Sequence, residues 1–267
     1  ALARRHIPEE MRAQLQLSLV RSHAAGTGPE VEEEVIRALM LLRLSTLCTG
    51  RTGVRPVVVE TYAKALNAGI VPVVREYGSL GCSGDLAPLA HCALALLGEG
   101  EVRVNGELKD AGDALAAAGI EPLQLREKEG LALINGTDGM LGQLCLAITD
   151  LRAAAKTADI ATAMTVEGLL GTLVVFADDL QQLRPHPGQA DAAANILQVA
   201  EGSEILEAAL EEFKKNQVQD AYSVRCAPQV AGGFRDTLTH TAQVAERELA
   251  AAVDNPVVTK DGRVVSN

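Results

Sequence analysis

The sequence contains very few aromatic residues and no tryptophan. Phe and Tyr make up only 2% of its 267 residues, whereas hydrophobic residues make up 48%. The core must therefore be built from Ala, Leu, Val and Ile, and the abundance of Ala and Leu favours closely packed helices. This much apolar content can form a substantial core without requiring more than one domain. We expect a mainly α fold in a single domain over residues 1–267.

The sequence also has no excess of positive charge. Its 35 acidic residues outnumber its 24 Lys and Arg residues, which gives a formal net charge of -11 at pH 7. Nucleic acids and anionic membranes bind proteins through basic patches, so this balance argues against both classes of partner. A small molecule is the expected ligand.

Cysteine pairs and long apolar runs are missing as well. The five cysteines include no CxxC pair and no short Cys/His spacing, so we expect reduced thiols and no metal site. Polar residues interrupt even the Ala-rich stretches, and no signal-peptide pattern is present, which predicts a cytoplasmic protein. Both ends look cut, because the chain starts without Met and stops just after a predicted turn into a new strand.

The most informative stretch that is present is GSLGCSGDLAPLAH, residues 78–91. Because Gly84 has no Cβ, its backbone nitrogen can fold back onto the Cys82 carbonyl and close a five-membered ring. Loss of water from this ring and from the Ser83 hydroxyl would leave an exocyclic methylene, which is an electrophile. The alternative interpretation is a plain turn in which Ser83 or Asp85 caps the following helix.

This stretch resembles the signature of the aromatic amino acid ammonia-lyases, with Cys82 where the family usually has Ala. The resemblance implies a 4-methylidene-imidazol-5-one formed autocatalytically from Cys82, Ser83 and Gly84. It also implies a long-helix bundle of the ammonia-lyase/fumarase-like type, assembled as a homotetramer. The resemblance covers essentially the whole chain, which would be about half of a family subunit, and the family's tyrosine base would lie before Ala1.

Two further segments resemble substrate-binding and electrophile-binding elements of the family. The segment Ser22-His23-Ala24-Ala25-Gly26 resembles the one that contacts the substrate side chain, and a Ser-His pair is typical of the histidine-specific members. Outside this context, His23 would be a packed or capping histidine. Asn135-Gly136-Thr137 resembles the family element whose Asn hydrogen-bonds the ring or the substrate amine, although a simple Asn-Gly turn is the alternative. The Asp138-Gly-Met that follows departs from the expected Gln-Ala-Ser.

A third segment, residues 217–229, resembles the block that binds the substrate carboxylate. The spacing of Gln219, Tyr222 and Arg225 would place them on one side of a helical turn or along one wall of a loop. Arg225 is suited to holding a carboxylate with a bidentate fork, with Gln219 bonding nearby. Tyr222 could donate to the ring oxygen or to the substrate. The alternative is that these are surface or interface residues.

Hydrophobic periodicity and breaker residues predict the elements around these segments. We expect a hairpin at 101–109, turning at Asn105-Gly106. Helices are expected at 9–24, from Pro29 to Gly50, 56–67, 85–97, 139–179, 189–200, 203–213 and 236–253.

The resemblance implies elimination of ammonia from L-histidine to give urocanate. We expect this chain alone to be weak or inactive, because the tyrosine base would lie outside it. Alternatives are a lyase or aminomutase that acts on tyrosine or phenylalanine, and a catalytically inert helical assembly fragment.

Overall fold

The computed structural model describes residues 6–81, 84–216 and 218–266. The chain divides into two compact units, of which the first comprises Ala1–Leu144 with Arg247–Asn267 and the second comprises Cys145–Glu246. Both boundaries fall inside long helices, α7 (Asp138–Gly168) and α12 (Ala227–Leu249). The single domain expected over residues 1–267 stays a prediction.

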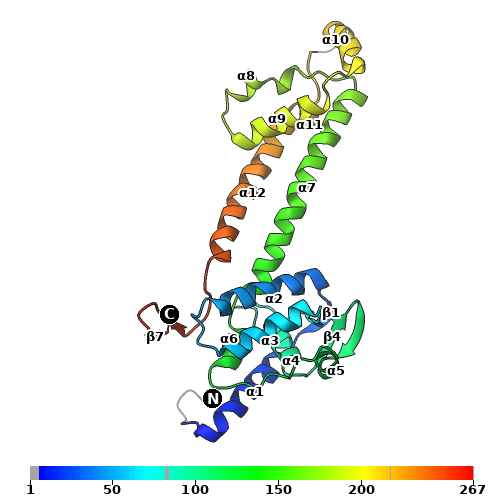
Figure 1. The fold of residues 1–267 in the computed structure, drawn as a ribbon. Coiled ribbons are helices and arrows are strands. Elements are labelled where there is room, and N and C mark those ends of the chain that lie inside the picture. Colours follow the sequence, from blue (N-terminus) through cyan, green and yellow to red (C-terminus); the bar gives the residue numbers. More distant parts are fainter. Residues whose placement is uncertain (1–5, 82–83, 217, 267) are drawn as a thin grey trace. The chain divides into compact units, whose positions relative to one another are not determined.

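Short helices packed around α4 form the first unit (Figure 1). Helix α4 is apolar on nearly every side, and buried residues such as Leu89 and Leu96 place it in the core. It packs against α1 and α6, while α2 packs against α3. The helices wholly within this unit are α1 (Glu9–His23), α2 (Glu33–Cys48), α3 (Pro56–Asn67), α4 (Leu86–Leu96), α5 (Ala111–Ala117) and α6 (Glu129–Ile134).

Three small antiparallel sheets complete the first unit. The predicted hairpin is present as β4 (Glu101–Val104) and β5 (Glu107–Asp110). Asn105 and Gly106 have φ values of 53° and 80°, as a type I′ turn requires. Strand β2 (Val71–Pro72) adds to β4, β1 (Thr27–Glu30) pairs with β3 (Arg75–Tyr77), and β6 (Val257–Val258) pairs with β7 (Val264–Val265).

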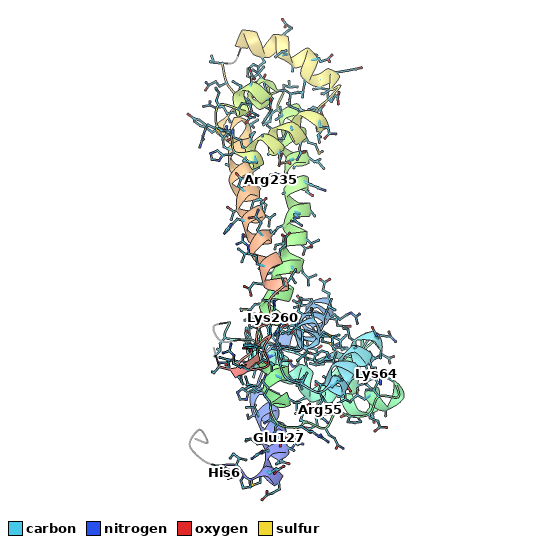
Figure 2. The ribbon with its side chains drawn as sticks, turned by 60° about the vertical axis from the view of Figure 1, so that its left-hand side comes forward. His6, Arg55, Lys64, Glu127, Arg235 and Lys260 are labelled. Carbon is cyan, nitrogen blue, oxygen red and sulfur yellow. The ribbon has the colours of Figure 1, made fainter. Side chains whose placement is uncertain are left out.

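Buried apolar side chains and one polar cluster hold the second unit together. Val166, Phe176 and Ile196 lie in its core. The buried Asp159 on α7 accepts a hydrogen bond of 2.8 Å from Asn195 and forms an ion pair with Arg235 on α12. Figure 2 labels Arg235 among the side chains of this unit. The elements that follow α7 are η1 (Val174–Phe176), α8 (Asp178–Gln181), α9 (Pro187–Val199), α10 (Glu204–Asn216), α11 (Tyr222–Arg225) and α12.

Three helices depart most from the sequence prediction. The helix expected from Pro29 begins at Glu33, because residues 27–30 pair with β3 instead. The rod expected over 139–179 ends at Gly168, where Leu170 takes a positive φ of 55° and breaks the helix. Its 31 residues span about 46 Å at 1.5 Å per residue, rather than roughly 60 Å. The last helix is longer than expected, because α12 already begins at Ala227.

Among the described residues, one stretch is long and apolar enough to cross a membrane by length and composition alone. It covers residues 129–168, and 44% of its most apolar window is buried. Core helices of soluble proteins satisfy the same criterion, so this is weak evidence for a membrane span.

Candidate active site

The glycine-rich run 78–91 leads from the end of β3 into the first half of α4, and its loop rests on the Asn135-Gly136-Thr137 turn. Gly84 has a φ of +109°, and a Cβ at this position would lie 2.8 Å from the Gly136 carbonyl oxygen. The next residue, Asp85, donates its backbone N–H to that same oxygen at 2.6 Å. Only glycine fits at position 84. Cys82 and Ser83, the other two members of the predicted ring, lie outside the described residues.

The Asp85 carboxylate anchors this loop but does not cap α4, which corrects one of the sequence alternatives. It is 1% exposed and makes no capping bond to its own helix. Its Oδ1 accepts the Ser79 hydroxyl at 2.5 Å, and its Oδ2 accepts the backbone N–H of Met140 at 3.0 Å. Met140 lies in the first turn of α7, where free N–H groups favour a negative charge. Asp85 therefore ties the loop to the start of α7.

Asn135 ends α6 and uses its amide nitrogen inside the protein. Its Nδ2 donates to Asp254 Oδ1 at 3.1 Å and to the Asn255 carbonyl at 3.2 Å. Asp254 is buried and also pairs with Lys128, whose Nζ donates to the Thr52 carbonyl at 2.7 Å. This anchoring leaves the Asn135 Oδ1 as the acceptor that a ligand could use.

An ion pair behind the same turn was missed by sequence reasoning. Arg43 is completely buried, and its Nη1 lies 3.1 Å from Asp138 Oδ2. A Cβ at Gly136 would meet Arg43 Nη1 at 2.1 Å, so the turn can approach the pair only because residue 136 is glycine. Burial raises the pKa of Asp138, and the Arg43 charge opposes that rise. The signal in the sequence was an arginine on the same helical stripe as Leu39 and Leu47.

Ser22 and His23 lie at the C-terminal end of α1. The Ser22 hydroxyl donates to the Leu19 carbonyl at 2.8 Å, and His23 Nδ1 lies 2.9 Å from the same oxygen. Nδ1 also lies 3.1 Å from the Ser22 Oγ. A carbonyl only accepts, so in the neutral tautomer that donates from Nδ1 to Leu19, Nε2 is an acceptor. The segment continues to Gly26, whose N–H contacts His91 at the end of the glycine-rich run.

The other predicted residues form a group within the second unit. Tyr222 and Arg225 are the first and last residues of α11, and the Arg225 guanidinium carbon lies 4.1 Å from the Tyr222 ring centroid. Such a stacked arrangement is a cation–π contact. Tyr222 is 72% exposed, and Arg225 Nε is buried without a hydrogen-bond partner in the described part of the chain. Gln219 lies before α11, outside the helix, and is exposed.

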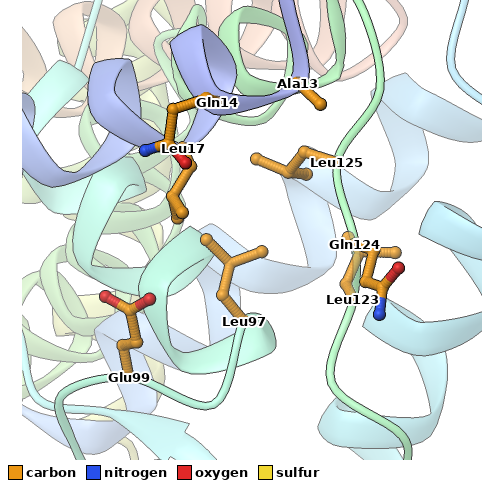
Figure 3. A pocket seen from close by; sticks show the side chains of 8 residues that line it. All are labelled: Ala13, Gln14, Leu17, Leu97, Glu99, Leu123, Gln124 and Leu125. Atoms are coloured by element: carbon orange, nitrogen blue, oxygen red, sulfur yellow. The ribbon is translucent and has the colours of Figure 1, made fainter. Parts of the chain in front are cut away.

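Two cavities lie near the elements that carry these groups. One in the first unit has a volume of about 260 Å³ and contains none of the predicted site residues (Figure 3). Its walls come from α1, from the end of α4 and from the loop before α6, and consist of Ala13, Gln14, Leu17, Leu97, Glu99, Leu123, Gln124 and Leu125. The other, of about 720 Å³, lies in the second unit and is lined by Tyr222 together with mainly apolar residues of α7 and α12. Of the predicted residues that the structure describes, Tyr222 alone borders one of these two cavities.

The aromatic amino acid lyase family matches residues 1–267. The chain belongs to this family. It is 64% identical to a histidine ammonia-lyase of Streptomyces avermitilis, over 100% of this chain and 52% of that protein. The chain thus spans about half the length of the curated relatives it matches.

Solved structures of aromatic amino acid lyases and related enzymes share the fold. Histidine ammonia-lyase from Trypanosoma cruzi superposes with a TM-score of 0.88 at 38% identity, covering 100% of this chain and 49% of that one. Pantoea agglomerans phenylalanine aminomutase gives a TM-score of 0.92 at 33% identity, covering 98% and 53%. The mainly α, long-helix fold predicted from the sequence is confirmed.

Proposed function

We propose that this chain is part of a histidine ammonia-lyase, which eliminates ammonia from L-histidine to give urocanate. The observation that carries the proposal is the docking of Gly84 and Asp85 on the Gly136 carbonyl. This contact joins the predicted electrophile loop to the turn that carries Asn135. The close relationship to named histidine ammonia-lyases supports the choice of substrate.

The predicted 4-methylidene-imidazol-5-one fits the residues around Gly84. Ring closure requires a residue without a side chain at position 84, and the space that a Cβ would need is occupied by the Gly136 backbone. When formed from Cys82, Ser83 and Gly84, this group would supply an electrophilic methylene carbon. Asp85 would hold the C-terminal side of the loop in place through its bond to Met140.

We assign Ser22, His23 and Asn135 to substrate binding and orientation. The free Nε2 of His23 is an acceptor, and the imidazole of histidine carries an N–H that could donate to it. The Oδ1 of Asn135 could accept a hydrogen bond from the substrate amine, because the amide nitrogen is already held by Asp254 and the Asn255 carbonyl. Both roles use polar atoms that are left available by the residues the structure describes.

We assign Gln219, Tyr222 and Arg225 of the second unit to the substrate carboxylate and its surroundings. Arg225 would provide the bidentate fork, and stacking on Tyr222 limits the orientations of its guanidinium plane. The phenol of Tyr222 would donate a hydrogen bond to the ring oxygen or the substrate. Gln219 would bond near the carboxylate. The complete enzyme would be a cytoplasmic homotetramer.

Intact mass and substrate turnover test this proposal separately. Ring formation should lower the mass of the chain by that of two water molecules. Ser83→Ala should abolish that loss without changing the far-ultraviolet circular dichroism, whereas Cys82→Ala should retain it because only the backbone carbonyl of residue 82 takes part. An unchanged mass in the parent chain would refute the cofactor assignment.

Turnover is measured in the full-length subunit as the near-ultraviolet absorbance of urocanate. Changing Ser22-His23 to His-Leu should lower kcat/KM for histidine. The loss should correspond to about 1–3 kcal/mol of transition-state stabilisation, which is the effect of an unpaired buried polar group. Equal kcat/KM ratios for histidine and tyrosine before and after the change would remove this pair from the pocket. Turnover of tyrosine or phenylalanine alone would overturn the choice of substrate.

A further inference from the structure

His91 closes the glycine-rich run, and none of the roles assigned above uses it. It lies on α4, and its imidazole Nε2 accepts the backbone N–H of Gly26 at 3.1 Å. That hydrogen bond joins two segments that are far apart in the sequence: the end of the electrophile run and the end of the segment that begins with Ser22.

Gly26 belongs to a tight bend between α1 and β1. The bend is closed on the other side by a bond of 2.8 Å from the Ala25 N–H to the His23 carbonyl. His23 is therefore separated from the His91 contact by only two residues and one short backbone turn. A displacement of Gly26 would be transmitted directly to the end of α1, where Ser22 and His23 lie.

The same bend packs against the start of the electrophile run. A Cβ built on Gly78 would lie 3.2 Å from the Gly26 Cα, and one built on Gly26 would lie 3.1 Å from His91 Nε2. Backbone therefore meets backbone at Gly26 and Gly78. The side chains of His91, Arg75 and Ala87 surround this junction, and of these three the imidazole hydrogen-bonds the Gly26 backbone. The hydrogen bond from Gly26 to His91 fixes the orientation of the Gly26 peptide, which the contact between the two glycines alone would leave free.

We propose that His91 is a positioning residue that holds the Ser22–Gly26 segment against the electrophile run by accepting the Gly26 N–H. Its role in substrate binding rests on the proposed function, because it acts through Ser22 and His23. The hydrogen bond requires a neutral imidazole with its proton on Nδ1, since a protonated Nε2 has no lone pair for the Gly26 donor.

The surroundings of His91 favour that neutral form. Burial lowers the pKa of its imidazole, and the positive charge of Arg75 on β3 lowers it further. Arg75 lies 3.8 Å from Glu30 of β1 and 3.7 Å from Glu101 of β4, so its charge is partly offset. Helices α1, α3, α5 and α6 pack against α4, and their titratable groups include His23, Tyr62, Asp113 and Glu129. The causes of the lowered pKa of His91 are burial first and the charge of Arg75 second.

The sign of the pH dependence follows from the lowered pKa. The unfolded imidazole titrates near 6.5, and the folded one titrates below that value. The Gly26 hydrogen bond is therefore intact at neutral pH and is lost as the pH falls through the lowered pKa of the folded state.

The experiment compares His91→Gln with His91→Phe. Gln places an acceptor oxygen near the position of Nε2 but does not titrate, whereas Phe keeps a ring and removes the acceptor. His240→Gln, an exposed histidine on α12, is the matched control. The probe is the Gly26 amide resonance in the 267-residue chain. Labelling Ala with carbonyl ¹³C and Gly with ¹⁵N selects the five glycines that follow an alanine, and Gly26 is the one of these that precedes a threonine, so sequential assignment to Thr27 identifies it.

In the parent chain and in the His240→Gln control, the Gly26 resonance should titrate with a midpoint below 6.5. In His91→Gln it should be independent of pH, and in His91→Phe its protection against hydrogen exchange should be lost at pH 7. An identical Gly26 resonance and protection in His91→Phe and the parent would overturn the proposal.

The second readout is KM for histidine in the full-length subunit. His91→Phe should raise KM by about 2- to 12-fold, the factor that the loss of one hydrogen bond produces, with a smaller change in kcat. His91→Gln should restore the parent value. A raised KM in both His91→Phe and His91→Gln would overturn the positioning role. A parent subunit that shows the expected Gly26 titration but does not turn histidine over would refute the proposed function alone.

Discussion

Removing the carboxylate of Asp138 should destabilise the first unit strongly. The Arg43 side chain is 0% exposed and that of Asp138 is 7% exposed, so water cannot replace the lost partner. In Asp138→Ala the guanidinium would keep only its 3.0 Å bond from Nη2 to the Val253 carbonyl, because Arg43 Nε already has no partner among the described residues. Breaking a buried pair from one side costs about 3–5 kcal/mol, and we expect a loss of that size.

The pKa of Asp138 predicts a different result for an apolar double variant. Burial raises this pKa above the usual 3.8 despite the attraction of Arg43. The folded state therefore holds the proton more tightly than the unfolded chain, and this carboxyl lowers stability as the pH rises from about 3.8 through the folded pKa. Desolvation thus outweighs the ionic attraction, and Arg43→Met with Asp138→Leu should recover most of the loss.

Urea denaturation at pH 7, followed by far-ultraviolet circular dichroism, gives the free energies of unfolding. Near-ultraviolet circular dichroism reports on the buried Tyr62, which lies in the same unit. Glu99→Ala is the control, because its ion pair with Arg21 is on the surface and should leave the midpoint unchanged. A loss below about 1 kcal/mol in Asp138→Ala, or a double variant as unstable as the single one, would refute this reasoning.

Two further stability predictions concern Glu129 and Gly84. Burial favours the neutral form of Glu129, but hydrogen bonds from Arg55 and from the backbone outweigh it and lower the pKa below 4.5. Glu129→Gln should lower the free energy of unfolding by about 1.5–3 kcal/mol at pH 7. Urea titrations should show this difference from the parent shrinking as the pH falls below about 4.5. A difference that stays constant with pH would contradict this. Gly84→Ala should cost about 1–3 kcal/mol and prevent the mass loss. Gly100→Ala is the control, because Gly100 also has a positive φ, of +80°, but a Cβ there would meet open space. Equal losses of stability in the two variants would argue against a clash between residue 84 and Gly136.

Local signals predicted the elements that local chemistry defines. Helix α3 has the predicted bounds, because Pro56 fixes its first turn and the residues after Asn67 lead into Gly69 at φ +68°. The hairpin at Asn105-Gly106 is another such case. Strand β1 could not be predicted in this way, because residues 27–30 become a strand only by pairing with β3 much later in the chain.

The sequence indicated which segments carry the candidate site, but the contacts between them appeared only in the fold. The docking of Gly84 on Gly136 joins the electrophile loop to the Asn-Gly-Thr turn, and neither motif predicts the other as its partner. Capping of its own helix by Asp85 was one of the alternatives left open by the sequence, and instead Asp85 bonds the first turn of α7 at Met140. A residue's local pattern specifies its hydrogen-bonding capacity, whereas tertiary packing selects the partner.

The departure at Asp138 illustrates how such packing absorbs a change in sequence. The resemblance led us to expect Gln-Ala-Ser after the Asn-Gly-Thr element, so the Asp-Gly-Met sequence raised the question of whether the adjoining wall still fits the family pattern. The Asp138 carboxylate is buried against Arg43, and Gly139 brings the helix within contact distance of Asp85. The Asp138 side chain thus supports the Asn135-Gly136-Thr137 turn through its ion pair with Arg43, which lies against Gly136. Asn135 is anchored by a different carboxylate, that of Asp254, so its amide is held by a bond that does not involve residue 138.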